Sequence, residues 1–125
     1  QRVREAQKQG RIRAILWHQG ESDSSVEKSK VYEAKLTDFF ARLRKEIGAS
    51  NTPIIMGTLG DFFVNKNPNG QAINSIIASY PQTHRHVYAV SSEGLVHKGD
   101  TTHFDASSAR ELGRRYANKL WEVKN

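Results

Sequence analysis

The sequence predicts an α/β fold with three layers, in which helices cover both faces of a parallel β-sheet. Short apolar runs, typical of buried strands, alternate with longer stretches in which apolar residues recur every three or four positions, as in amphipathic helices. The 125 residues are 37% hydrophobic and 26% charged, which suits one globular domain. Parallel strands need crossover helices between them, and the alternation supplies these.

The first half of the chain supplies one strand between two helices. Residues 3–9 are predicted to be the end of a helix stopped by Gly10, and residues 12–17 a short buried strand. Residues 19–25 form a polar loop. A long amphipathic helix follows and ends at Gly48, with an apolar face made of Val31, Tyr32, Leu36, Phe39, Phe40, Leu43 and Ile47.

The second half adds two strands and two helices. Residues 53–59 and 86–91 are predicted to be strands, and a short helix precedes Pro81. Residues 60–70 are expected to form a turn-rich loop in which Phe62 and Phe63 are exposed.

The last helix is expected after a loop at residues 92–104. Its N-terminus is either a capping box of Ser108 with Glu111 or an N-cap at Asp105. The residues expected to face inward are Ala109, Leu112, Tyr116, Leu120 and Val123.

Composition excludes several classes of function. The net charge of +6 permits attraction to polyanions, but the basic residues lie among acidic ones at helical spacing, which indicates solvated helix faces. No nucleic-acid partner is therefore expected. No apolar run approaches the roughly 18 residues that span a bilayer, so no membrane association is expected. The absence of cysteine excludes disulfides and thiolate metal sites but leaves the compartment open.

Two polar loops follow strands and carry the residue types of catalysis. They are residues 17–23 and residues 99–105, and both should open at the carboxyl edge of the sheet. Asp100 and His103 are three positions apart, so the carboxylate can accept the imidazole Nδ1 proton and leave Nε2 as a general base. Gln19 offers an amide donor for an oxyanion, and Glu21 could orient neighbours or bind a substrate hydroxyl.

Plainer interpretations of these loops remain open. A lone histidine is usually a surface or capping residue, and the first loop could simply cap the helix that follows it. No G-x-S-x-G or Gly-Asp-Ser turn supplies a nucleophile within the chain. No H-E-x-x-H or similar spacing occurs, so no metal is expected.

Three segments together are similar to one enzyme family. Residues 17–23, Trp-His-Gln-Gly-Glu-Ser-Asp, resemble the third conserved block of the SGNH hydrolases that include acetylxylan esterases of carbohydrate esterase family six and sialate O-acetylesterases. Residues 99–105 and the helical residues 109–117 look like that family's last block and closing helix, and residues 53–60 resemble one of its strands. The likeness covers nearly the whole chain.

The resemblance implies an SGNH, flavodoxin-like fold. Residues 1–125 would be the C-terminal part of a single esterase domain, without its N-terminal strand or strands. The family's Gly-Gln-Ser block, with the nucleophilic serine, would lie upstream of Gln1 and would be the partner that completes the site. Its strand would pair beside residues 12–17, so the apolar edge at residues 14–17 would be exposed without it.

The resemblance also implies roles for five residues. His103 would be the general base and Asp100 its orienting acid, Gln19 would donate to the oxyanion, and Gly20 and Glu21 would shape the pocket. The implied reaction removes O-acetyl groups from a carbohydrate such as acetylated xylan through an acyl-enzyme, without a cofactor.

Two other classes of function compete with this interpretation. A non-catalytic carbohydrate-binding protein on the same fold would use aromatic residues as sugar-stacking surfaces, namely Trp17, Phe62, Phe63 and Tyr80. A basic nucleic-acid module is the other class, but the chain has no recognisable reading motif.

Overall fold

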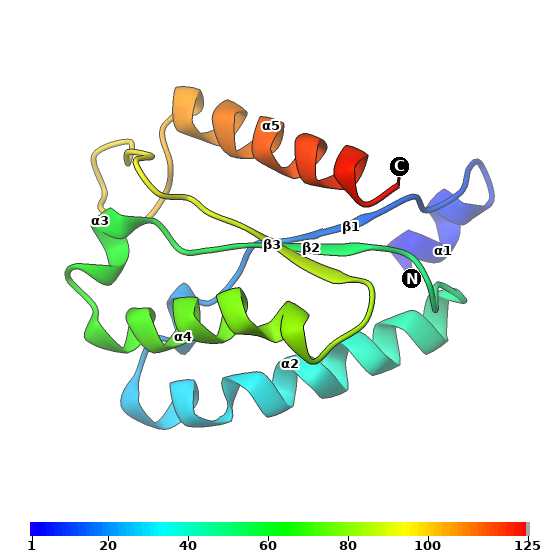
Figure 1. The fold of residues 1–125 in the computed structure, drawn as a ribbon, viewed down its shortest axis with the longest axis horizontal. Helices are drawn as coiled ribbons and strands as arrows, with labels where there is room; N and C mark the ends of the chain where they lie inside the picture. Colours follow the sequence, from blue (N-terminus) through cyan, green and yellow to red (C-terminus); the bar gives the residue numbers. More distant parts are fainter. Residues whose placement is uncertain (125) are drawn as a thin grey trace.

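The computed structural model describes residues 1–124 and has the predicted α/β architecture, with a parallel sheet between helical layers (Figure 1). No helix among these residues is both long and apolar enough to cross a membrane. In chain order the elements are α1 (Arg2–Gln7), β1 (Ile15–Trp17), η1 (Glu21–Asp23), α2 (Val26–Ile47), β2 (Ile54–Gly57), α3 (Asp61–Val64), α4 (Pro68–Ser79), η2 (Tyr80–Gln82), β3 (Val87–Val90) and α5 (Ala106–Glu122).

The described sheet has three strands in the order β1-β2-β3, and both pairs are parallel. The central strand β2 is fully buried, since Ile54, Ile55 and Met56 have no exposed surface. A parallel strand covered on both faces is expected to be an unbroken apolar run, and the apolar run at residues 53–59 predicted this strand. β1 lies at an edge of this sheet, where Leu16 is 58% exposed.

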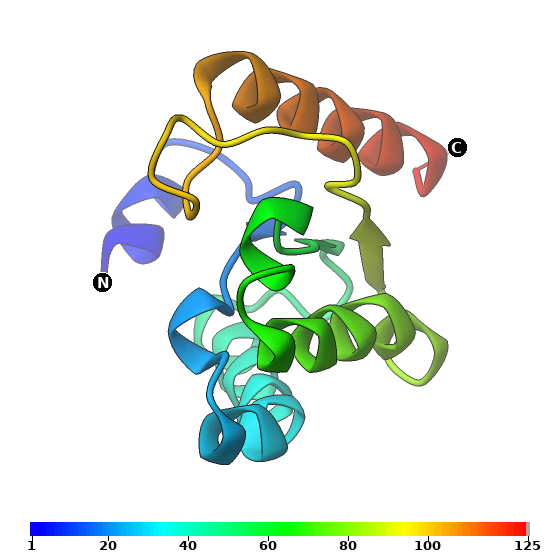
Figure 2. The same cartoon turned by 90° about the vertical axis from the view of Figure 1, so that its left-hand side faces the viewer.

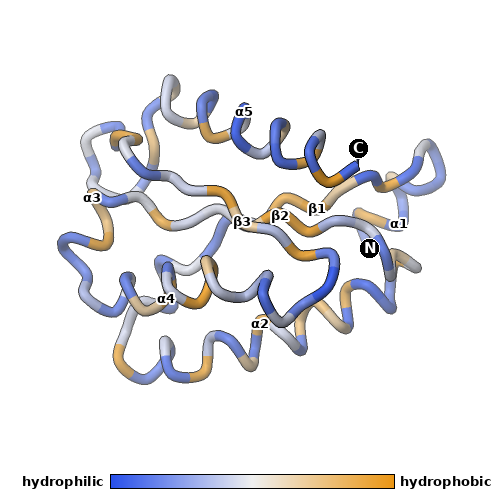
Figure 3. Tube along the Cα trace, viewed as in Figure 1, coloured by the Kyte–Doolittle hydropathy of each residue, from blue (hydrophilic) through white to orange (hydrophobic). Residues whose placement is uncertain are grey.

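Successive residues of β2 face two different cores because side chains alternate along a strand. Ile54 and Met56 pack with residues of α2 and α4, whereas Ile55 packs with Leu112 and Tyr116 of α5. Figures 1 and 2 show α5 on one face of the sheet and α2 with α4 on the other. The hydropathy colouring places apolar residues along the strands and on the inner sides of the helices (Figure 3).

Helix α2 ends where the sequence predicts, because Gly48 adopts the left-handed conformation (φ 62°) at its C-cap. Its buried stripe is narrower than predicted. Val31 and Phe39 are 42% and 37% exposed, while the inward positions fall mainly at intervals of four: Tyr32, Leu36 and Phe40. Phe39 lies beside this stripe and packs on Trp17 of the edge strand, with ring centroids 5.1 Å apart.

The prediction of an open loop at residues 60–70 was wrong. The short helix α3 turns Phe63 and Val64 into the core, and Phe63 is only 8% exposed. Helix α4 then starts with Pro68 in its first turn, a position where the missing proline N–H costs nothing. Tertiary burial of an aromatic ring therefore makes ordered structure from a stretch rich in turn residues.

At the start of α5 the structure decides between the two predicted caps. Asp105 is the N-cap, and its carboxylate accepts from the backbone N–H of Ser108 at 2.7 Å. The capping box based on Ser108 is wrong, because Ser108 lies in the first turn. Its hydroxyl instead accepts from the N–H of Val96 at 2.9 Å and so ties the helix to the preceding loop.

One contact fixes α5 on the sheet. The Tyr116 hydroxyl donates to the carbonyl of Trp17 at 2.7 Å. The Tyr116 hydroxyl lies against Gly57, where an added Cβ atom would be 2.3 Å from its oxygen. Burial raises the pKa of Tyr116 well above its ordinary value, so the phenol stays protonated and remains a donor.

We expect Gly57→Ala to lower the free energy of unfolding by about 1–3 kcal/mol, because the added methyl displaces Tyr116 from β2. The control is Gly113→Ala on the exposed face of α5, where nothing lies within 4 Å of the new Cβ. That change should raise stability by roughly 0.5–1 kcal/mol through helix propensity. Chemical denaturation of both variants measures the contrast, and equal effects would contradict the role given to Gly57.

Candidate active site

The loop between β3 and α5 closes on itself. His97 and Phe104 form an isolated antiparallel bridge. Beside it, the N–H of Lys98 donates to the carbonyl of His103 at 2.9 Å, and the N–H of Asp105 donates to the carbonyl of Val96 at 3.0 Å. We call residues 96–105 the hairpin loop. It holds its shape mainly through contacts among its own residues.

The predicted hydrogen bond between Asp100 and His103 is confirmed. His103 Nδ1 lies 2.6 Å from Asp100 Oδ2, and Asp100 Oδ1 accepts the backbone N–H groups of His103 (2.8 Å) and Thr102 (3.0 Å). These bonds, led by the His103 backbone N–H, hold the pKa of Asp100 well below its usual range. An ionised carboxylate can only accept, so Nδ1 carries the hydrogen and Nε2 is free for proton transfer.

The His103 ring is mostly open to solvent, with its side chain 69% exposed. Packing contributes little to its position. The Asp100 carboxylate therefore sets the orientation of the ring, which is the arrangement expected of a general base that must meet a substrate.

Gly20 gives the first loop its shape. This residue is buried with φ 151°, and a Cβ there would lie 2.7 Å from the Ile73 side chain. Only glycine tolerates both this positive φ and this close approach of Ile73, and its presence lets the chain turn sharply from β1 into η1. The hydroxyl of Tyr32 donates to the carbonyl of Gln19 at 2.9 Å and fixes the same turn from α2.

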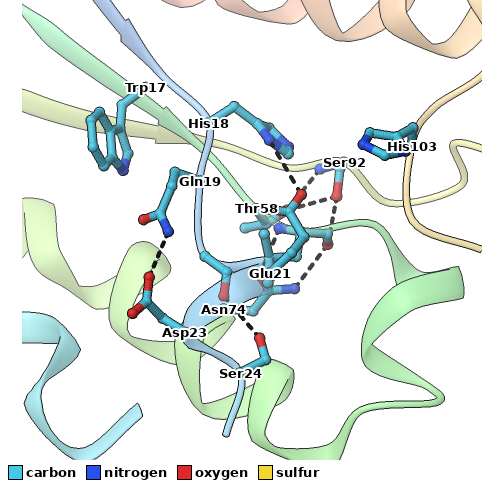
Figure 4. Close-up of polar contacts among 12 residues, drawn as sticks. Trp17, His18, Gln19, Glu21, Asp23, Ser24, Thr58, Asn74, Ser92 and His103 are labelled. Atoms are coloured by element: carbon cyan, nitrogen blue, oxygen red, sulfur yellow. Dashed lines mark hydrogen bonds and ion pairs between the residues drawn. The ribbon is translucent and has the colours of Figure 1, made fainter. Parts of the chain in front are cut away.

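The two side chains before Gly20 point in different directions. Figure 4 shows the His18 ring on the side that faces His103 and the Gln19 amide on the other side, beside Trp17. Gln19 Nε2 donates to Asp23 Oδ2 at 2.5 Å. The structure therefore brings the first loop to the same sheet edge as His103, but the Gln19 amide is engaged with Asp23.

Sequence reasoning gave His18 no role, although it is a nearer neighbour of the hairpin loop than Gln19. Its ring makes a T-shaped contact with Phe104, with centroids 5.4 Å apart, and its Nδ1 lies 3.8 Å from Glu21 Oε1. Glu21 is thus paired with His18 rather than with His103. The three-residue spacing of a histidine and a carboxylate, the same as in Asp100 and His103, was the available signal.

A partly buried polar network joins the loops at this edge of the sheet (Figure 4). Asn74 of α4 accepts from the Leu59 N–H at 2.7 Å and donates to the Leu59 carbonyl at 3.0 Å. The fully buried Ser92 also donates to that carbonyl and bonds the Thr58 hydroxyl, both at 2.9 Å. The loops after β2 and β3 are therefore joined, and no sequence motif marks these residues.

The aromatic residues proposed as sugar-stacking surfaces are mostly unsuitable. Phe63 and Tyr80 are buried, at 8% and 2% exposure, and Trp17 packs against Phe39 and Phe40. Phe62 is partly exposed but packs on neighbouring rings. Among residues 1–124, no three histidine or carboxylate side chains gather closely enough to hold a metal ion.

The fold and the site define a class of protein: an α/β protein with a hydrogen-bonded Asp-His pair at the carboxyl edge of its parallel sheet. Residues 1–122 match the family model described as carbohydrate esterase, sialic acid-specific acetylesterase. The chain belongs to this family.

A solved structure shows the same fold. It is the X-ray structure of a protein from Arabidopsis thaliana, with a TM-score of 0.75 and 23% sequence identity, and the match covers 96% of this chain and 50% of that one. The chain thus spans about half the length of that protein. None of the curated proteins matches the sequence at a significant level.

The ionised state of Asp100 should appear in the pH dependence of stability. Because its folded pKa is depressed, the carboxylate stabilises the fold above the ordinary carboxyl pKa of about 4, and this stabilisation is lost as the pH falls towards the lower, folded value. We expect wild type to exceed Asp100→Asn in free energy of unfolding above about pH 4. The difference should shrink on further acidification.

Asn is the matched change because its Oδ1 can still accept the two backbone N–H groups. Denaturant titrations of both proteins from neutral to acidic pH provide the measurement. A difference that stays constant with pH would show that the charge of Asp100 makes no contribution.

Proposed function

We propose that this chain is the C-terminal part of a serine esterase that removes O-acetyl groups from carbohydrate. Membership of the acetylesterase family supports the general activity. The observation that carries the proposal is the 2.6 Å bond between His103 Nδ1 and Asp100 Oδ2, made by a ring that is mostly exposed to solvent. No cofactor is needed for this chemistry.

In the proposed mechanism the nucleophilic serine comes from a segment upstream of Gln1. His103 Nε2 accepts the serine proton as the serine oxygen attacks the acetyl carbonyl. The tetrahedral intermediate collapses, and the sugar oxygen leaves with the proton from His103. Water then attacks the acyl-enzyme while His103 takes its proton, and acetate leaves as the serine regains a hydrogen. The Asp100 carboxylate stabilises the imidazolium in both halves.

Gln19 is proposed as an oxyanion donor. Its amide nitrogen carries two hydrogens, and the bond to Asp23 uses one, so the second is available to a developing negative charge. Gly20 would shape the pocket through its backbone conformation. Glu21 would shape the pocket, either by accepting from a sugar hydroxyl or by holding His18.

The upstream segment is proposed to add a strand beside β1 and bring the serine to the site. Leu16 is 58% exposed on β1, which has no partner on its outer edge among the described residues. An open apolar edge is a surface that proteins usually pair or cover. We propose acetylated xylan as the substrate, because the segments His-Phe-Asp and Leu-Gly-Arg-Arg-Tyr-Ala resemble acetylxylan esterases more than sialate esterases.

The activity is tested on the complete natural polypeptide that contains these residues. Release of p-nitrophenol from its acetate, lost after treatment with a serine-directed reagent, supports a serine esterase. Release of acetate from acetylated xylan, compared with O-acetylated sialic acid, tests the substrate. An intact, folded polypeptide with no activity on any of these esters would count against the proposal.

His103→Ala in that polypeptide should lower acetyl-ester turnover by about 10³-fold or more, because the general base is lost. The free energy of unfolding should change by no more than about 0.5 kcal/mol, since the ring is mostly solvated. His84→Ala is the control, because this histidine stacks on Tyr80 ahead of β3, at the opposite edge of the sheet. Steady-state kinetics that find similar turnover in both variants would remove His103 from the mechanism.

A further inference from the structure

We propose that His97 is a positioning residue that holds the hairpin loop in the shape required by Asp100 and His103. This inference rests on the proposed function for its effect on turnover. The role acts through the loop backbone, since His97 bonds neither of the two side chains directly.

The evidence begins with the hydrogen bonds of the His97 ring. Its Nδ1 accepts the backbone N–H of Gly99 at 2.9 Å and that of Thr101 at 3.2 Å. These two donors are the residues on either side of Asp100. A nitrogen that accepts must carry a lone pair, so His97 is in the neutral form with its hydrogen on Nε2.

The loop needs such support because its backbone is strained at Thr101. Thr101 has φ 58°, which a β-branched residue rarely adopts, whereas Gly99 takes its φ of 117° without a steric penalty. Such conformations persist only where neighbouring groups over-determine them. Here four hydrogen bonds to side chains do so: His97 accepts from the backbone N–H groups of Gly99 and Thr101, and Asp100 accepts from those of Thr102 and His103.

The His97 ring is itself held from outside the loop. It packs against Phe62 of α3, with ring centroids 5.2 Å apart, and Phe62 also meets Phe104 at 5.2 Å. The backbone of His97 pairs with Phe104. The ring therefore transmits the position of α3 to the turn that carries Asp100. Without the Nδ1 acceptor, Gly99 and Thr101 would be free to relax and the carboxylate would shift relative to His103.

Two variants separate the acceptor from the ring. His97→Asn keeps an oxygen at the position of Nδ1 but lacks the ring, whereas His97→Phe keeps a ring against Phe62 but has no acceptor. In the complete natural polypeptide we expect His97→Phe to lower kcat by about 10- to 100-fold, because a small misplacement of a catalytic group has costs of this size. KM should stay within about threefold, and His97→Asn should keep kcat within about fivefold.

Wild-type kcat in His97→Phe, or equal losses in the Phe and Asn variants, would overturn the proposal, because the acceptor would then be irrelevant. If His97→Phe fails to fold, Ala and Asn make a second matched pair. Both lack the ring, and only Asn has the acceptor. Equal kcat values for that pair would again overturn the inference.

A spectroscopic readout makes the test independent of esterase activity. Proton NMR should show the His103 Nδ1–H as a downfield signal in wild type and His97→Asn, and should lose it in His97→Phe. If this pattern holds without any ester turnover, the positioning role stands and the proposed function fails. If turnover is present but the signal is unchanged in His97→Phe, the positioning role fails and the esterase stands.

Discussion

The hydrogen bond from Tyr116 to the carbonyl of Trp17 is the contact on which the rest of the arrangement depends. It joins residues 99 positions apart and connects the last helix to the point where β1 becomes the first polar loop. Gly57 makes it possible, because any side chain there would meet the phenol. Helix α5 consequently lies close on the sheet, and the loop that precedes it comes to the edge where His18 contacts Phe104.

The carboxyl edge of the sheet combines a well-packed polar frame with an exposed catalytic candidate. Asn74 and Ser92 satisfy the polar groups of the buried backbone and give the strand ends a fixed frame. His103, by contrast, is exposed and depends on local hydrogen bonds for its orientation. Polar networks that reach into the core favour a single arrangement, because a buried group left without a hydrogen-bond partner costs free energy. Changes to the frame should therefore act mainly through stability, while changes to the hairpin loop should also alter the geometry of the Asp-His pair.

Much of this organisation was predictable from local sequence. Buried parallel strands are apolar runs, Gly48 can adopt a left-handed cap, and a three-residue spacing lets Asp100 reach His103 within a turn. The features that could not be predicted depend on contacts made in the folded chain. Burial of Phe63 depends on how α3 meets α4, and the bond between Gln19 and Asp23 forms across the turn that contains Gly20. Neither is encoded by periodicity or spacing, and the roles of the site residues remain proposals.

The short sequence range of the hairpin loop has a consequence for how the protein folds. Its bridge joins His97 to Phe104, and loops of about ten residues close within roughly 10–100 ns. The sheet assembles more slowly, since parallel pairing must bring together distant segments and the contact between Trp17 and Tyr116 spans nearly the whole chain. The ends of this loop can thus meet early and repeatedly in the unfolded ensemble, whereas the Asp-His pair is fixed only in the late step, when the loop docks with α5 onto the sheet and onto α3.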